Sequence, residues 1–157
     1  LAAMKLHMIS NAAAKEKMLT LFFKDTPLND FQEKCNRFIE EQLPRLIRPG
    51  ALREINKHKQ NNTAGVGVTG SARDGVEGCG RQNDIICIAT KLEVRENKIS
   101  GKINGRNCNG IEKVNRIKAC FQLDHYDTII AYGDTKGDKE MLSLATFAYY
   151  KPFRERI

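Results

Sequence analysis

Two aspartates stand four residues apart in the loop that runs from Tyr132 through Gly133 to Asp138. The apolar run 128–132 before this loop predicts a buried strand. Ligands of open α/β sheets bind at the carboxyl ends of strands, so Asp134 and Asp138 can approach one point there. Such carboxylates suit Mg²⁺, which takes one or two of them together with water and phosphate. A surface turn in which an aspartate caps a helix is the alternative, and the spacing alone leaves both open.

A hydroxyl residue and a glycine follow an earlier predicted strand, over 65–69. Thr69, Gly70 and Ser71 stand where this strand would end, and a short helix is predicted over 72–80. Backbone N–H groups and a hydroxyl at such a junction form a cradle for phosphate. We therefore expect Thr69 and Gly70 to bind phosphate, although the pattern alone favours an ordinary capped turn.

A lysine stands near the start of a helix predicted over 109–120. The helix dipole favours cations at the opposite end, so Lys113 is not placed there for dipole reasons. An ammonium group directed at an anionic ligand would explain its position. A solvated surface lysine is the alternative.

The predicted secondary structure that must position these residues changes near Pro44, from helices alone to alternating helices and strands. Before it, two amphipathic helices are expected, over 12–23 and from Pro27 onward. After it, helices and strands alternate: helices over 49–59, 72–80, 109–120 and 139–145, strands over 65–69, 85–88, 128–132 and 147–150, and a hairpin of 92–94 with 98–103. This alternation predicts an α/β fold with a parallel sheet that helices cover on both faces.

Composition and charge narrow the class of protein. The chain of 157 residues carries a net charge of +7, which favours anionic partners. Its Lys and Arg residues are spread along the chain and no RNA-binding or zinc-finger motif occurs, so no nucleic-acid partner is expected. Five scattered cysteines without a CxxC pair argue against a disulfide scaffold or zinc site and favour a cytoplasmic protein.

The order of these motifs resembles the haloacid dehalogenase superfamily, and within it the phosphoserine-phosphatase-like branch. Members of that branch carry a Ser or Thr at a strand end, then a Lys, then a Gly-Asp-x-x-x-Asp loop. The segments 89–94, 99–103, 107–114 and 132–142 are also similar to bacterial members described as phosphoserine-phosphatase-like or phosphatidylglycerophosphatase-like. The resemblance covers essentially the whole chain and is strongest over 85–153.

The resemblance implies a fold and an activity. The fold would be a three-layer Rossmann-like core over 44–157 with a small β-hairpin, preceded by a partial helical cap over 1–43. The activity would be Mg²⁺-dependent hydrolysis of a phosphomonoester on a phosphorylated small molecule or lipid head group. Asp134 would bind Mg²⁺ with support from Asp138, Lys113 would hold the nucleophile and the phosphoryl oxygens, and Thr69 and Gly70 would bind phosphate.

The sequence departs from this family in its first motif, an Asp-x-Asp at the end of the first core strand. None of its eight aspartates stands two residues from another. We therefore expect a core without its first strand and a fragment that is inactive as given. Because that strand is central, its loss would leave an apolar slot and open edges through which the chain could self-associate. The alternative is a non-catalytic metal- or phosphate-binding scaffold of the same fold, which the two weakening glycines of the 65–69 strand also favour.

Overall fold

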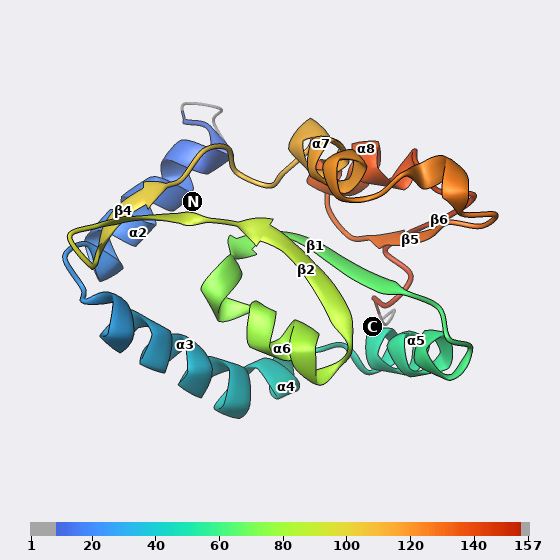
Figure 1. Cartoon of the computed structure of the whole chain (residues 1–157), viewed down its shortest axis with the longest axis horizontal. Coiled ribbons are helices and arrows are strands. Elements are labelled where there is room, and N and C mark those ends of the chain that lie inside the picture. The colour runs from blue at the N-terminus through green and yellow to red at the C-terminus, as the bar shows by residue number, and fades with distance from the viewer. Residues whose placement is uncertain (1–8, 155–157) are drawn as a thin grey trace.

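The structure is a computed structural model that describes residues 9–154. Its elements alternate between helix and strand after an all-helical start (Figure 1). The helices are α2 (Asn11–Phe23), α3 (Leu28–Glu41), α4 (Leu43–Leu46), α5 (Pro49–Gln60), α6 (Glu77–Gln82), α7 (Ile111–Cys120) and α8 (Lys139–Leu142). The strands are β1 (Gly65–Ala72), β2 (Ile85–Thr90), β3 (Leu92–Arg95), β4 (Lys98–Ile103), β5 (Ile130–Gly133) and β6 (Phe147–Tyr150). None of the described helices is long and apolar enough to cross a membrane.

Parallel strand pairs confirm the predicted α/β fold class. β1 pairs in parallel with β2, and β5 pairs in parallel with β6. In each pair a helix lies between the two strands in the chain, α6 in the first and α8 in the second. β3 and β4 form the predicted antiparallel hairpin. Within residues 9–154, however, the strands make three two-stranded sheets, and no ladder joins β1 to β5.

The strands expected to be buried are only partly so. Ile86 in β2 is 54% exposed and Ile130 in β5 is 38% exposed. The strand expected to be buried over 128–132 is therefore buried only at its end, at Gly133, whereas β2 is buried over Ile88, Ala89 and Thr90. A pair of strands has two outer edges and few covering neighbours, so apolar side chains that a wide sheet would bury stay partly in water.

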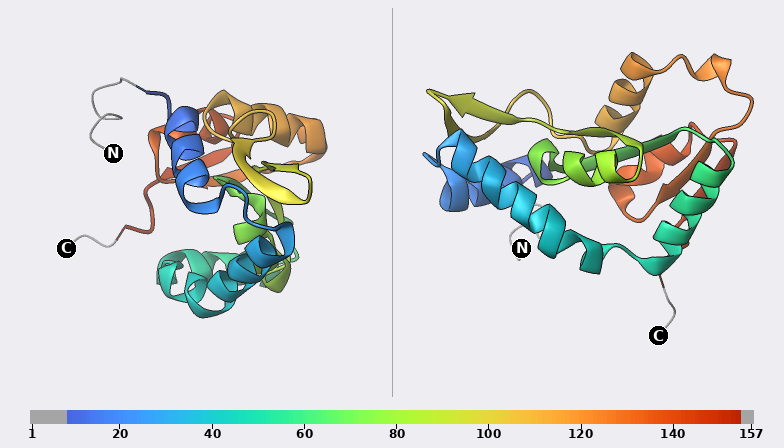
Figure 2. Two further views of the ribbon diagram at one scale, coloured as in Figure 1. Left: turned by 90° about the vertical axis from the view of Figure 1, so that its left-hand side faces the viewer. Right: turned by 60° about the horizontal axis from the view of Figure 1, so that its bottom comes forward.

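The main buried apolar cluster lies between the N-terminal helices and the hairpin. It contains Phe31 and Cys35 from α3, Leu92 from β3 and Ile99 from β4. Ile99 is only 1% exposed. Figure 2 shows α2 and α3 beside the hairpin at one end of the elongated molecule. The cluster therefore joins residues on both sides of Pro44.

Two local features fix the position of the hairpin. Its turn residues Glu96 and Asn97 both have positive φ, 47° and 58°, as a two-residue type I′ turn requires. Gly101 in β4 also has positive φ, and a Cβ there would lie 2.7 Å from the Cα of Thr20 in α2. A glycine at this position therefore lets the helix backbone approach the strand closely.

The helix expected over 72–80 differs from the structure. β1 continues to Ala72, a 3₁₀ turn covers Arg73–Gly75, and α6 begins at Glu77. Three glycines lower the helix propensity of this segment. One of them, Gly80, packs so tightly on β2 that a Cβ would lie 2.4 Å from the Sγ of Cys87. Tertiary contacts with β2 therefore decided where the strand ends and the helix begins.

Candidate active site

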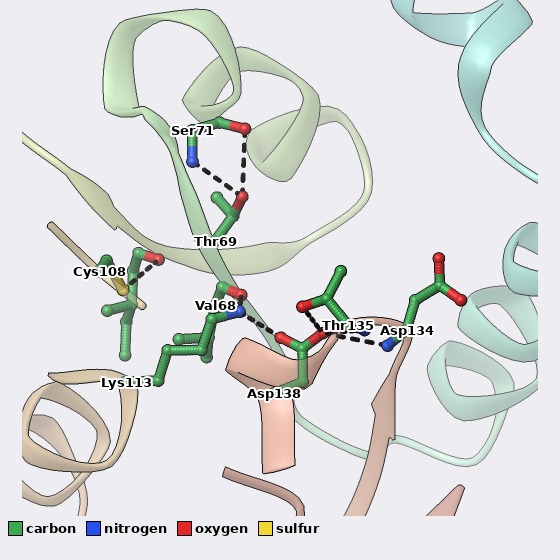
Figure 3. A network of polar contacts seen from close by, with 9 residues as sticks. Val68, Thr69, Ser71, Cys108, Lys113, Asp134, Thr135 and Asp138 are labelled. Carbon is green, nitrogen blue, oxygen red and sulfur yellow. Dashed lines mark hydrogen bonds and ion pairs between the residues drawn. The ribbon is translucent and has the colours of Figure 1, made fainter. Parts of the chain in front are cut away.

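Lys113 lies at the centre of the site, between the two parallel strand pairs. Its ammonium donates to the carbonyl of Val68 in β1 at 2.6 Å and to Oδ1 of Asp138 at 2.7 Å. Lys113 is only 6% exposed, and the side chain reaches from the first turn of α7 toward both partners (Figure 3). The position of Lys113 in the sequence predicted an anionic partner, and in this structure that partner is the carboxylate of Asp138.

Asp138 uses both carboxylate oxygens within the protein. While Oδ1 accepts from Lys113, Oδ2 accepts from the backbone N–H of Asp134 at 3.0 Å and from Thr135. Thr135 donates both its N–H and its hydroxyl, each at 2.8 Å. Thr135 and Asp138 thereby form a capping box around a 3₁₀ turn, Lys136–Asp138. The loop after β5 is thus held closed by the residue that was expected to support a metal.

The hydrogen bonds decide the charge state of Asp138. Burial alone would raise the pKa of this carboxyl group, but its four donors favour the charged form more strongly. The bond from Lys113 is the largest of these favourable contributions, and Thr135 and Asp134 add to it. Together they lower the pKa of Asp138 from 3.8 to about 2. Lys113 and Asp138 therefore form a buried ion pair across the loop.

Asp134 points away from this ion pair, as Figure 3 shows. Its two carboxylate oxygens accept from the guanidinium of Arg154 at 2.6 Å and 3.0 Å. Arg48 adds a weaker contact at 3.7 Å. The bond from Arg154 is the main reason why the pKa of Asp134 is lowered. The side chain is well exposed, so the carboxylate is charged and accessible from solvent but occupied by arginine.

Thr69 and Gly70 lie inside β1, near its carboxyl end. The regular register with β2 stops at the pair Thr69 and Ala89, and the strand continues irregularly to Ala72. The Thr69 hydroxyl accepts from the N–H of Ser71 at 3.1 Å. The expected helix N-terminus directly after Ser71 is not present. The role of Thr69 and Gly70 in phosphate binding stays a prediction.

A lysine of α2 that no sequence motif indicates reaches this strand end. Lys15 of α2 donates to the carbonyl of Gly70 and to Oδ1 of Asn107. Asn107 also accepts from the hydroxyl of Thr90, and its amide donates to Asn11 of α2. One lysine among many on a helix gives no sequence signal of such a contact. Only the packing of α2 against the hairpin brings it there.

The described residues fit a divalent cation only in part. No group of three or more His, Cys, Asp or Glu side chains gathers within residues 9–154 in a way that could hold a metal ion. Of the two expected ligands, Asp138 is fully engaged by protein donors, whereas Asp134 is exposed to solvent and paired with arginine. One carboxylate is enough for Mg²⁺ when water and substrate phosphate complete the shell. The donor set therefore suits a weak, substrate-dependent Mg²⁺ site centred on Asp134.

Solved structures of similar fold are known. A protein of unknown function from Bordetella pertussis Tohama I has a TM-score of 0.80 at 18% identity, covering 92% of this chain and 67% of that one. A phospho-aspartyl intermediate analogue of phosphoserine phosphatase has a TM-score of 0.65 at 19% identity, covering 88% and 64%. These likenesses show that the chain shares the fold of phosphoserine phosphatases.

Sequence comparison gives the same family. Protein CicA from Caulobacter vibrioides is 32% identical over 138 residues, which make up 85% of this chain. The match covers 60% of CicA, so the chain spans well under two thirds of this relative. The family of haloacid dehalogenase-like hydrolases matches residues 1–143. Sequence and fold agree with the order of the motifs, and the chain belongs to the haloacid dehalogenase-like hydrolase family.

Proposed function

We propose that this chain forms the cap helices and the lysine–aspartate half of the active site of a Mg²⁺-dependent phosphomonoester hydrolase. The observation that carries the proposal is the buried ion pair of Lys113 and Asp138, which connects the carboxyl ends of β1 and β5. Burying two charges is costly unless they are paired and hydrogen-bonded. Val68 and Asp138 accept two of the three N–H groups of Lys113, so the third can donate to an anion at the strand ends, as phosphoryl transfer requires.

Each side chain has a distinct role in this proposal. Asp134 would hold Mg²⁺, which when bound neutralises the charge of the phosphate. Asp138 orients Lys113 and closes the loop instead of binding the metal directly. Lys113 holds the phosphoryl oxygens, and Thr69 with Gly70 contacts the phosphate from β1. The substrate would be a phosphorylated small molecule or a lipid head group.

The same proposal holds that the chain as given does not turn over substrate. Phosphoryl transfer in this family needs a carboxylate nucleophile, and the sequence has no Asp-x-Asp pair to supply it. That motif would end a strand between β1 and β5, which belong to separate sheets here. The bond from Lys113 to Val68 of β1 supports this location for the nucleophile.

The test compares the chain with an extended version that carries an additional N-terminal strand ending in Asp-x-Asp. We expect hydrolysis of p-nitrophenyl phosphate with Mg²⁺ by the extended chain only. Asp134→Asn should abolish that turnover, whereas Asp84→Asn, at an exposed surface aspartate, should not. An extended, folded chain without turnover, or with turnover that Asp134→Asn leaves unchanged, would contradict the proposal.

A non-catalytic binding role is the second candidate, and the missing nucleophile favours it. In that case the chain would bind Mg²⁺ or phosphate without reacting. Calorimetric titration with MgCl₂ and with inorganic phosphate distinguishes this role from the absence of any site. Binding that Asp134→Ala does not weaken would argue against the metal site altogether.

We also propose that the open strand edges favour self-association. Val66 in β1 and Ile130 in β5 are each 38% exposed, and their strands lie in different sheets. Unpaired edges with apolar side chains readily pair with another strand. Sedimentation velocity over a hundredfold range of concentration should reveal a dimer or larger species. A monomer throughout that range would contradict this part of the proposal.

A further inference from the structure

Two lysines, one from the core and one from the cap, contact the same strand on either side of Thr69. Lys113 donates to the carbonyl of Val68, and Lys15 of α2 donates to the carbonyl of Gly70. Val68 and Gly70 are two residues apart, which is about 7 Å along an extended strand. The two ammonium groups therefore bracket the residue whose hydroxyl is proposed to bind phosphate.

The two lysines differ in how their charge is balanced. Lys113 is paired with Asp138 at 2.7 Å, so this pair is neutral overall. None of the salt bridges among residues 9–154 includes Lys15, whose oxygen partners are the uncharged Gly70 carbonyl and Asn107 side chain. Arg116, which donates to the carbonyl of Ala89 opposite Thr69, is paired with Glu112 at 2.9 Å. The uncompensated positive charge beside Thr69 is thus that of Lys15.

The environment of Lys15 makes an unpaired charge costly. Its side chain is half-buried, and burial is the main reason why the pKa of Lys15 is lowered. A partly desolvated ammonium gains more from an anion than one fully in water does. The space beside Gly70 is confined as well, because a Cβ there would lie 3.3 Å from the carbonyl oxygen of Cys108 and 3.4 Å from Nζ of Lys15.

We propose that Lys15 is a substrate-binding residue of the cap, which contacts an oxygen of the phosphate group beside Gly70. The inference rests on the proposed function, since it assigns a further ligand of the same phosphate. The inference also gives α2 a role beyond packing, because this helix brings a cation without an acidic partner among residues 9–154 to β1. Asn107 holds that cation in place without neutralising it.

The test is calorimetric titration of inorganic phosphate into the full chain and three variants at Lys15 and on the same helix. Lys15→Gln keeps a donor for Gly70 and Asn107 but removes the charge, and we expect it to weaken phosphate binding about tenfold or more. Lys15→Arg keeps the charge and should bind within about threefold of wild type. Lys17→Gln removes an exposed charge two residues away and should bind like wild type.

A second variant separates binding from a structural role of the same contact. Asn107→Asp places a carboxylate against Lys15, which replaces the lost bond from Asn107 to Asn11 by an ion pair between α2 and the core and cancels the free charge. We expect phosphate affinity to fall about tenfold while the urea midpoint without phosphate does not decrease. If Lys15 only tied the cap to the core, Asn107→Asp would lower phosphate affinity by the same factor in wild type and in Lys15→Gln, and that result would overturn the inference.

The remaining outcomes distinguish this inference from the proposed function. Wild-type binding that Lys15→Gln leaves unchanged, or that Lys17→Gln weakens equally, overturns the role of Lys15 alone. No phosphate binding by the folded wild-type chain, with or without Mg²⁺, overturns the proposed phosphate site and the inference with it. A wild-type site that Lys113→Met weakens and Lys15→Gln does not would leave the proposed function standing.

Discussion

The buried ion pair of Lys113 and Asp138 gives the most direct test of how the site is built. We consider Asp138→Asn, which preserves shape but removes the charge. Asparagine has one amide oxygen in place of two carboxylate oxygens. It therefore cannot accept hydrogen bonds both from Lys113 and from the N–H and hydroxyl groups of Thr135. On one of the two sides, its NH₂ group would face N–H or O–H donors and make no hydrogen bond with them. Lys113 would then be left charged and 6% exposed without an anionic partner.

The expected cost follows from burial. Removing one partner of a buried, hydrogen-bonded ion pair costs about 3–5 kcal/mol, because the other charge stays desolvated. Asp84→Asn is a matched control, since Asp84 pairs with Lys59 at 2.8 Å, almost the separation of the buried pair. The Asp84 side chain is 78% exposed. An exposed pair contributes about 1 kcal/mol at most, so the same substitution should cost little there.

Urea denaturation followed by far-UV circular dichroism measures both variants at pH 7. Asp138→Asn should lower the free energy of unfolding by about 3–5 kcal/mol or leave the chain unfolded without urea. Asp84→Asn should stay within about 0.5 kcal/mol of wild type. Equal effects of the two substitutions would refute the argument that burial makes the Lys113–Asp138 pair important.

The pH dependence provides a second check with a defined sign. The pKa of Asp138 is lowered from 3.8 to about 2 on folding, so the stabilisation is fully present above pH 4 and is lost as pH falls toward 2. The difference between these pKa values corresponds to about 2 kcal/mol. The gap in stability between wild type and Asp138→Asn should therefore shrink by about this amount between pH 5 and pH 2. A constant gap would mean that Asp138 is not charged in the folded chain.

Two further predictions concern the same loop. Arg154→Gln should raise the affinity of the chain for Mg²⁺ about two- to fivefold in calorimetry, because the guanidinium of Arg154 occupies both oxygens of Asp134. Arg37→Gln removes an equal charge from the exposed face of α3, and an equal gain there would contradict competition at Asp134. Gly133→Ala should lower the free energy of unfolding by about 1–3 kcal/mol, because the new Cβ would lie 2.8 Å from the Cβ of Asp138 and 3.0 Å from Leu142. Gly75→Ala is its control, since a Cβ there meets nothing within 4 Å, and comparable losses in the two urea titrations would rule out crowding as the cause.

Sequence alone determined those features that depend on local pattern. The hairpin followed from alternation around Glu96 and Asn97, whose positive φ angles suit the turn. The α/β class followed from alternating elements, and the order of Thr69, Lys113 and Asp134 indicated the family that the comparisons found. These inferences succeed because side-chain periodicity, turn residues and motif order are written directly in the chain.

Only the tertiary structure decided which side chains meet and how their charges are balanced. The sequence suggested Asp134 and Asp138 as a pair of metal ligands. In the folded chain Asp138 forms an ion pair with Lys113, and Asp134 forms one with Arg154. It also brings Lys15 to Gly70, across 55 positions of sequence. Long-range contacts of this kind depend on how α2, β1 and the loop after β5 pack. The local pattern of apolar and polar residues does not specify that packing, so the ion pairs at the site could not be predicted from the sequence.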